Sequence, residues 1–155
     1  VCQARKFDTR IGVFKHVFEM VVIHHTGIVV RQIRSHYEKH MAHLFPERLL
    51  GPMIHDPLQK VNAVFISTAS GCLELLEPTG DDSPISKVAQ MSPAGYHHVC
   101  LEMPNLDRQL NICRSHGQIV VSPPKPAIAF GGRRIAFVMG QDRLLWELLE
   151  ASPTE

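Results

Sequence analysis

The run His24-His25-Thr26-Gly27-Ile28-Val29-Val30 decides the fold of this chain, because its opening histidine pair occurs a second time. The pair His97-His98 lies 73 positions later (97 − 24 = 73) and again stands at the start of an apolar run. A second motif keeps the same offset, since Glu-Leu-Leu-Glu at residues 74–77 recurs at residues 147–150. Two landmarks at one offset indicate two copies of one structural unit.

The repeat places the same chemistry at equivalent positions of each copy. In both copies 49 positions separate the second histidine from the first glutamate (74 − 25 and 147 − 98). Imidazole nitrogens and carboxylate oxygens are ligands of borderline and hard divalent metal ions. Ligands this far apart in sequence are not those of a zinc finger, whose ligands come in closely spaced pairs. The spacing favours a metal site assembled between the two copies.

Each copy has the pattern of a βαβββ unit, in which β-branched apolar runs predict strands and apolar residues at helical spacing predict helices. In the first copy, strands are expected at residues 21–30, 61–67 and 72–77, a helix at 31–45, and a short irregular or strand segment at about 51–57. In the second copy, strands are expected at 97–102, 119–122, 133–139 and 144–149, and a helix from its capping residue Asn105 to about His116, with Gly117 as the stop.

The two units predict an α+β fold built as one fused domain over residues 21–155. The modules are expected at about 21–78 and 96–150, and the linker at 79–95 should hold a short helix from Ser83-Pro84 to Gln90. Two separate units of about 73 residues would be marginally stable. Residues 1–20 have no counterpart at this offset, so they are expected to form an N-terminal extension outside the repeat.

Strand geometry limits how many of the repeated residues can meet. Successive side chains of a strand face opposite sides. In an unbroken strand, only one histidine of each His-His pair and one glutamate of each Glu-Leu-Leu-Glu run can therefore face a shared pocket. The repeat therefore offers four ligands among eight candidates, and periodicity alone does not select them.

The composition excludes several classes of function. The chain has 155 residues, is 45% hydrophobic, and has a net charge of +1 and a pI near 7.9. This balance gives no electrostatic case for binding nucleic acid or a membrane surface. Charged residues interrupt positions 1–20, which excludes a signal peptide there. The four cysteines, Cys2, Cys72, Cys100 and Cys113, form no spaced framework, so we expect reduced thiols and a cytoplasmic protein.

The chain resembles the vicinal-oxygen-chelate superfamily, which has the glyoxalase/bleomycin resistance/dioxygenase-like fold, and within it the methylmalonyl-CoA epimerases. The resemblance covers most of residues 22–150 and rests on five stretches: His25 to Val30, Glu74 to Pro78, Asp82 to Ile85, Gly95 to Cys100, and the final Glu147-Leu148. It implies two tandem βαβββ modules whose curved sheets surround a metal cleft.

The resemblance also implies a set of metal ligands, namely His25, Glu74, His98 and Glu147. The cofactor would be a divalent ion such as Co, Ni, Zn, Mn or Mg. The implied activity is a metal-dependent epimerisation by proton abstraction at the α-carbon of a malonyl-type acyl thioester, carried by CoA or by a carrier protein. A carboxylate in a partly dry pocket can serve as the base.

The sequence departs from the epimerase pattern in two places. An acid that the relatives often carry near Asn62 is absent, so Glu74 or Glu147 is the expected substitute as second base. The turn at residues 139–143 also differs, which bears on the identity of the substrate. Residues expected to contact substrate are Gln59 and Asn62 from the first module, and Lys125, Arg133 and Arg134 from the second, which suit CoA phosphates or a carboxylate.

Two other functions fit the same fold. One is a glyoxalase-like lyase or another chelate enzyme of a biosynthetic pathway, and the other is a metal-free small-molecule binding or resistance protein. A dioxygenase is less favoured, because four protein ligands leave fewer open positions than a two-histidine, one-carboxylate site. Exposed strand edges in such a fold leave room for a homodimer.

Overall fold

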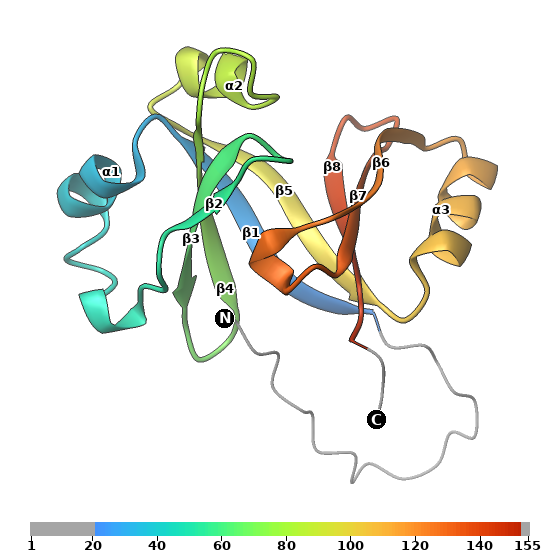
Figure 1. Cartoon of the computed structure of the whole chain (residues 1–155), viewed down its shortest axis with the longest axis horizontal. Coiled ribbons are helices and arrows are strands. Elements are labelled where there is room, and N and C mark those ends of the chain that lie inside the picture. Colours follow the sequence, from blue (N-terminus) through green and yellow to red (C-terminus); the bar gives the residue numbers. More distant parts are fainter. Residues whose placement is uncertain (1–20, 153–155) are drawn as a thin grey trace, which may run out of the picture.

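The computed structural model describes residues 21–152, and within this range eight strands form one strongly curled sheet (Figure 1). The elements of the first half are β1 (Val22–Val30), α1 (Ile33–His40), η1 (Glu47–Leu49), β2 (Ile54–Asp56), β3 (Val61–Ser67) and β4 (Cys72–Pro78). The linker holds α2 (Ser86–Met91), and the second half consists of β5 (Ala94–Met103), α3 (Leu106–Ser115), β6 (Ile119–Pro126), η2 (Ile128–Phe130), β7 (Arg134–Met139) and β8 (Leu145–Glu150).

The strand order β2-β3-β4-β1-β5-β8-β7-β6 places the two modules side by side. Strand β1 pairs parallel with β4, β5 pairs parallel with β8, and β1 and β5 pair antiparallel with each other. The predicted βαβββ repeat is confirmed. The curved sheets of the two modules are joined edge to edge through β1 and β5, which makes them one continuous surface.

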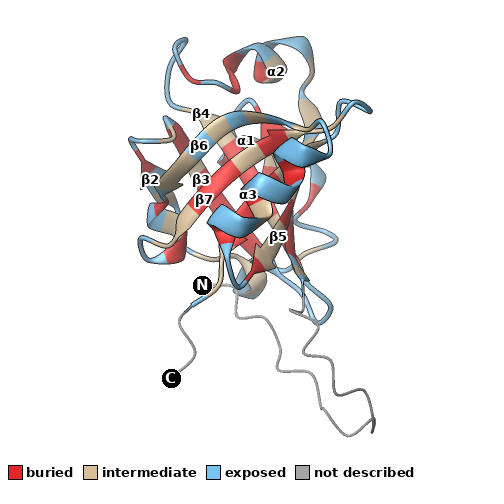
Figure 2. Ribbon diagram, turned by 90° about the vertical axis from the view of Figure 1, so that its right-hand side faces the viewer, coloured by how far each residue is buried: buried red, intermediate tan, exposed pale blue. Residues whose placement is uncertain are grey.

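The helices α1 and α3 lie at opposite ends of the molecule, outside the curled sheet, and their buried faces cover its convex side (Figures 1 and 2). Ile33, Tyr37 and Met41 pack on the first module, and Leu106, Leu110 and Cys113 pack on the second. Helix α2 closes one end of the concave side, where Ile85 and Ala89 pack against Val29, Val61, Ala63 and Leu76. The concave side between the modules is therefore the place for a site.

Three element boundaries differ from the sequence-based expectation. Helix α1 ends at His40, five residues before the predicted end, and a turn leads from there to Pro46. Strand β6 continues through its prolines to Pro126, four residues beyond the predicted end at residue 122. Proline lacks an N–H donor, and β6 tolerates it because this strand lies at an edge of the sheet. In α2 no side-chain cap is made, and the helix begins after the predicted Ser83-Pro84 start.

The predicted cap of α3 is confirmed, since Asn105 Oδ1 accepts a hydrogen bond of 2.9 Å from the Arg108 N–H. Gly117 ends this helix region with a φ of 75°, a left-handed conformation that glycine adopts without steric cost.

The cysteines only partly match the expectation of four reduced thiols. Cys100 and Cys113 are free and buried, whereas Cys72 is not a free thiol, which corrects the expectation at that position. Cys2 and the predicted extension at residues 1–20 lie outside the described residues.

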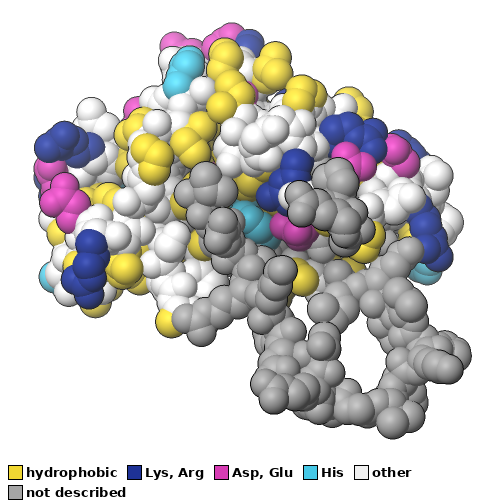
Figure 3. All heavy atoms as spheres, turned by 60° about the horizontal axis from the view of Figure 1, so that its bottom comes forward, with side chains coloured by type: hydrophobic (Ala, Val, Ile, Leu, Met, Phe, Trp, Pro, Cys, Tyr) yellow, Lys and Arg dark blue, Asp and Glu magenta, His cyan; other side chains and the backbone are white. Residues whose placement is uncertain are grey.

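The described surface has no dominant charge on the face shown in Figure 3, where Lys and Arg side chains are scattered and lie beside Asp and Glu side chains. Among residues 21–152, no helix is long and apolar enough to cross a membrane.

Candidate functional site

Four buried side chains converge on the concave side of the sheet: His25 on β1, Glu74 on β4, His98 on β5 and Glu147 on β8. These strands are the four at the centre of the sheet. Gly27, two positions after His25, lies opposite Glu74 on the neighbouring parallel strand. Cys100, two positions after His98, lies opposite Glu147 in the same way. Residues two apart share a face of a strand, so both side chains of each module point to the same side.

The donor atoms of this cluster have separations suited to one metal ion. His25 Nε2 lies 3.0 Å from His98 Nε2 and 3.1 Å from Oε2 of both Glu74 and Glu147. His98 Nε2 lies 3.6 Å from Glu74 Oε2 and 3.2 Å from Glu147 Oε2. Metal bonds of about 2.0–2.2 Å, at angles from about 90° to tetrahedral, place two ligands about 2.8–3.6 Å apart. All five separations lie in that interval, so the donor set fits a divalent cation.

A buried oxygen without a hydrogen-bond partner supports this fit. Glu147 Oε2 is buried and accepts no hydrogen bond of acceptable geometry from any described residue, although two imidazole nitrogens lie close to it. A buried polar atom left in this way costs free energy unless a ligand or ion satisfies it.

The electrostatics of the cluster also favour a cation. Burial lowers the pKa of His25, but the negative charges of Glu74 and Glu147 outweigh burial and raise that pKa to about 10. Burial raises the pKa of the Glu147 carboxyl, but its contacts with His25 and His98 dominate and hold the pKa well below its usual range. The Glu147 carboxylate is therefore ionised at neutral pH, and its field attracts positive charge.

The first histidine of each pair lies in a β-bulge. In the antiparallel pairing of β1 with β5, His24 has no partner residue on β5, and His97 has none on β1. A bulge inserts an extra residue and breaks the alternation of faces, so the parity that holds in an unbroken strand does not apply to these pairs. The His24 ring therefore lies beside the His25 ring, with an Nδ1–Nδ1 distance of 2.9 Å, and the His97 ring lies beside the His98 ring, with an Nδ1–Nδ1 distance of 2.8 Å.

These two histidines can orient the imidazoles of the cluster. Burial, together with the neighbouring His25, lowers the pKa of His24, and burial with His98 lowers that of His97 to about 4, so both rings are neutral at pH 7. A neutral ring can accept a hydrogen bond at Nδ1. The Nδ1–H groups of His25 and His98 can then donate to them, which leaves each Nε2 lone pair pointing into the cluster.

The lack of a side chain at Gly27 leaves room for the His98 ring. A Cβ atom at this glycine would lie 2.6 Å from His98 Nδ1 and 2.8 Å from His98 Nε2. Gly27 therefore stands opposite His98 because a larger residue would displace the ring.

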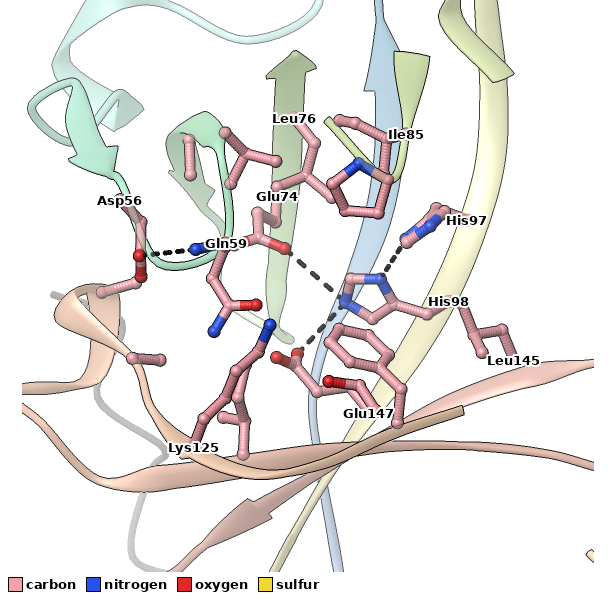
Figure 4. Close-up of a pocket in the computed structure, with 18 of the residues that line it drawn as sticks. Asp56, Gln59, Glu74, Leu76, Ile85, His97, His98, Lys125, Leu145 and Glu147 are labelled. Carbon is pink, nitrogen blue, oxygen red and sulfur yellow. Dashed lines mark hydrogen bonds and ion pairs between the residues drawn. The ribbon is translucent and has the colours of Figure 1, made fainter. Parts of the chain in front are cut away.

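Three residues of the cluster, Glu74, His98 and Glu147, form part of the wall of a cavity of about 350 Å³ between the modules (Figure 4). Most of the wall is apolar, and includes Ile54, Val61, Ala63, Leu76, Ile85, Phe130, Ile135, Phe137, Met139 and Leu145. The polar side chains are few, namely those of Asp56, Gln59, Glu74, His97, His98, Ser122, Lys125 and Glu147. An apolar cavity with a few convergent polar groups is typical of a small-molecule site.

Gln59 reaches this cavity from the turn between β2 and β3. Asp56 Oδ1 accepts hydrogen bonds of 3.0 Å from the N–H groups of Leu58 and Gln59, and Lys60 has a φ of 57°. Asp56 Oδ2 accepts a hydrogen bond of 3.1 Å from the Ile128 N–H, so the same carboxylate links the turn to the second module. Sequence reasoning missed Asp56, although an aspartate at the start of a turn was the available signal.

Asn62 does not line the cavity. It lies between Val61 and Ala63, which do, and alternation therefore places it on the convex side of β3. Its Nδ2 donates to Glu77 Oε1 over 3.2 Å, and its Oδ1 lies 2.9 Å from His55 Nδ1. The structure therefore does not bring Asn62 to the cavity with the other predicted site residues.

Arg133 and Arg134 are also outside the cavity wall, in contrast to Lys125. Arg133 donates to Glu102 over 3.1 Å, and Arg134 pairs with Glu150 at 2.6 Å and with Asp107 at 2.9 Å. Both guanidinium groups are engaged in ion pairs on the protein itself, so the structure does not bring them to the cavity with Lys125.

A pair of βαβββ units that surround one His/Glu cluster defines the glyoxalase-type class of proteins. Comparison with known families agrees: residues 24–137 match the Glyoxalase/Bleomycin resistance protein/Dioxygenase superfamily, and this chain belongs to that superfamily.

Curated relatives include epimerases. The ethylmalonyl-CoA/methylmalonyl-CoA epimerase of Cereibacter sphaeroides is 26% identical over 121 residues, which cover 77% of this chain and 89% of the relative. An uncharacterized protein of Bacillus subtilis is 32% identical over 133 residues, covering 81% and 89%. The mitochondrial methylmalonyl-CoA epimerase of Mus musculus is 30% identical over 114 residues, covering 68% and 61%.

Solved structures share the fold. A hypothetical protein from Bacillus halodurans has a TM-score of 0.73 and 24% identity, and the match covers 87% of this chain and 97% of that one. A variant of Streptomyces coelicolor methylmalonyl-CoA epimerase in complex with 2-nitronate-propionyl-CoA has a TM-score of 0.69 and 24% identity, covering 86% and 96%.

Proposed function

We propose that this protein is a metal-dependent epimerase that moves the α-proton of a malonyl-type acyl thioester. The observation that carries the proposal is the convergence of His25, Glu74, His98 and Glu147 beside a largely apolar cavity, whose wall includes Glu74, His98 and Glu147. The epimerases among its relatives support this reaction class, and they make CoA the first thioester carrier to test.

The four residues of the cluster would hold the metal through two imidazole nitrogens and two carboxylate oxygens. A divalent cation there supplies Lewis-acid stabilisation of the negative charge that develops on a carbonyl oxygen. The apolar wall excludes water from the same space, which strengthens every electrostatic interaction inside it.

Glu74 and Glu147 are proposed to accept and return the α-proton. Both contact the imidazoles through Oε2, so Oε1 of each carboxylate is the atom assigned to proton transfer. The two carboxylates come from different modules and approach the cluster from opposite sides (Figure 4). An epimerase needs a proton acceptor and a donor on the two faces of the planar intermediate, and this pair meets the need without the missing acid near Asn62.

Deuterium exchange tests the proposal. The protein is stripped with a chelator, loaded separately with Co, Ni, Zn, Mn or Mg, and mixed with methylmalonyl-CoA in heavy water. We expect the metal-loaded protein to replace the α-proton by deuterium, as seen by loss of its proton resonance, and the stripped protein to be inactive. The Glu147→Gln and Glu74→Gln variants should each lose most of the exchange.

Two results would reject the proposal in favour of its competitors. Metal-dependent turnover of a glutathione hemithioacetal without α-exchange on the malonyl thioester would identify a lyase. Failure of every metal ion to bind to the stripped protein, measured by calorimetry, would favour a metal-free binding protein of the same fold.

A further inference from the structure

One nucleophilic side chain of the cavity wall has no part in the proposed proton transfer. Lys125 is the one Lys or Arg side chain among the described residues that line the cavity. Asp56, Glu74 and Glu147 line the same cavity, yet Lys125 takes part in none of the ion pairs or side-chain hydrogen bonds of residues 21–152. Its half-buried side chain points into the cavity (Figure 4). An amine placed in this way is available to react with a bound ligand.

An irregularity of β6 turns Lys125 inward. In a regular strand, residues three apart face opposite sides. Ser122 and Lys125 are three apart and both line the cavity, because the pairing of β6 with β7 shifts its register between them, at Pro123 and Pro124. A shift of this kind inserts one extra residue and breaks the alternation of faces. Lys125 thereby comes to lie opposite Ile135, whose buried side chain also lines the cavity.

The cavity brings this amine close to an acyl thioester whose carbonyl lies at the His/Glu cluster. The cavity volume is about 350 Å³, near the lower end for small-molecule sites, so a bound acyl group and Lys125 share one small space. Holding two reactants in such a space turns an encounter between molecules into a reaction within one complex and raises its rate by orders of magnitude. The largely apolar wall also limits the water that would hydrolyse the thioester instead.

We propose that Lys125 is an acyl-acceptor site, at which the side-chain amine takes the acyl group of a thioester bound in the cavity. This inference rests on the proposed function, because it needs a thioester whose carbonyl lies at the His/Glu cluster. It goes beyond that function, since proton exchange leaves the thioester intact whereas acylation of Lys125 consumes it.

The step is balanced without any further reactant. The uncharged amine nitrogen attacks the carbonyl carbon and forms a C–N bond, and the C–S bond of the thioester breaks. One of the two protons of the amine passes to the thiolate, so CoA leaves as a free thiol and the lysine remains as an amide. The acyl chain then occupies the cavity. Each chain that has reacted should therefore be closed to the next substrate molecule.

Mass spectrometry of the Co-loaded protein after incubation with methylmalonyl-CoA tests the site. We expect one methylmalonyl group per chain, carried by Lys125. The exposed residues Lys39 and Lys87 should react at least about tenfold more slowly, because they lack the proximity that the cavity supplies. Hydroxylamine should leave the adduct in place, since it cleaves an ester, such as one on the cavity residue Ser122, and spares an amide.

Two comparisons separate a built acceptor from ordinary lysine chemistry. Lys125→Arg should gain no group, whereas the matched control Lys87→Arg, at an exposed position of α2 outside the cavity wall, should be acylated at the wild-type rate. Cobalt content and melting temperature check that each variant is folded. The same incubation in urea should remove the preference for Lys125, because the unfolded chain has no cavity to hold the thioester.

The loss of activity provides a second readout. Wild-type protein that is preincubated with methylmalonyl-CoA and then freed of it should lose deuterium exchange on fresh substrate in step with the acylated fraction. Lys125→Arg should keep its own starting rate over the same preincubation.

Four outcomes would overturn the proposal. Equal acylation of Lys39, Lys87 and Lys125 in the folded protein would show that the cavity gives no advantage, and a group that Lys125→Arg still gains would lie elsewhere. A hydroxylamine-sensitive adduct would assign the acceptor to a hydroxyl group. A wild type that gains no group has no acceptor site.

The acceptor site and the proposed function fail separately. Deuterium exchange by a wild type that is never acylated would keep the epimerase and remove the acceptor site. Selective acylation of Lys125 in a protein without exchange would keep the acceptor site and remove the epimerase.

Discussion

The two modules are nearly equivalent at the centre of the sheet and different at its edges. In the first module Glu74 lies opposite Gly27 on the neighbouring parallel strand, and in the second Glu147 lies opposite Cys100, two positions after the histidine in each case. A bulge at the preceding histidine also occurs in both modules. At the edges, β2 has three residues and is followed by a tight turn, whereas β6 has eight residues and contains three prolines.

This difference separates two tasks. The central strands of both modules contribute one imidazole and one carboxylate each, so the repeated positions serve the proposed metal site. The edge strands contribute unlike groups, with Gln59 beside β2 and Lys125 on β6. Symmetry is retained where one ion is proposed to be held from two sides, and it is lost where the proposed substrate would be recognised.

The largest expected effect tests the equivalence at the centre. His25→Ala and His98→Ala should each weaken Co²⁺ binding by more than about 100-fold, since each removes one of four ligands. Calorimetry of the stripped proteins measures the effect, and His40→Ala, an exposed change on α1, should bind like the wild type. Unequal losses that differ by more than tenfold would contradict the equivalence of the modules.

The next largest effect is expected at Gly27, whose counterpart in the second module is Cys100. Gly27→Ala should force the His98 ring aside, weaken Co²⁺ binding by about 10–100-fold and cost about 1–3 kcal/mol of unfolding free energy. Cys100→Ala should cost about 1 kcal/mol through lost packing and retain Co²⁺ binding within a few-fold.

Gly95→Ala is the control for this pair, because a Cβ there would meet its nearest neighbour, Val88, at an ordinary 3.7 Å. Denaturant unfolding and calorimetry measure both quantities. Wild-type metal affinity in Gly27→Ala would show that the close approach to His98 is not required.

A smaller effect distinguishes how the two outer helices begin. Helix α3 has a local cap from Asn105, whereas the Gln32 side chain makes no cap bond at α1. There Glu77 Oε2 accepts a hydrogen bond of 2.7 Å from the Ile33 N–H. Asn105→Ala and Glu77→Ala should each reduce the unfolding free energy by about 1 kcal/mol, and Gln32→Ala should change it by less than about 0.5 kcal/mol. A Gln32→Ala loss as large as that of Glu77→Ala would contradict this assignment.

The smallest effect concerns Glu150, the counterpart of Glu77 in the second module. Its hydrogen bond to Arg134 lowers the pKa of Glu150 below its ordinary value. A lowered pKa in the folded protein stabilises it above the pKa of the unfolded chain, near 4.3, and this stabilisation is lost as the pH falls further. The difference in melting temperature between the wild type and Arg134→Gln should therefore shrink from about pH 6 to about pH 3. A constant difference over this range would contradict the ion pair.

The sequence predicted the central strands well because their signals are local and repeated. The offset of 73 residues and the apolar runs were enough to predict the strands β1, β3, β4, β5, β7 and β8 to within a few residues. Alternation along β3 could also have excluded Asn62, which stands between two apolar residues that face the cavity.

Other features depend on contacts that no local pattern contains. The bulges at His24 and His97 arise from the pairing of β1 with β5, so strand parity alone could not place these side chains. Strand β6 extends through prolines because β7 pairs with one side of it and the other side is an edge. The roles of Arg133 and Arg134 depend on Glu102, Asp107 and Glu150, which lie far away in sequence.

The central position of the four ligand strands has a consequence for how such a protein can change. Substitutions in the β2–β3 turn, in β6 and in η2 alter the walls of the cavity while the strands that carry the ligands keep their hydrogen-bonded neighbours on both sides. A variant library restricted to these outer segments should therefore retain cation binding in most of its members while it explores new acyl groups. Divergence of substrate and retention of the proposed metal site are thus compatible within one chain.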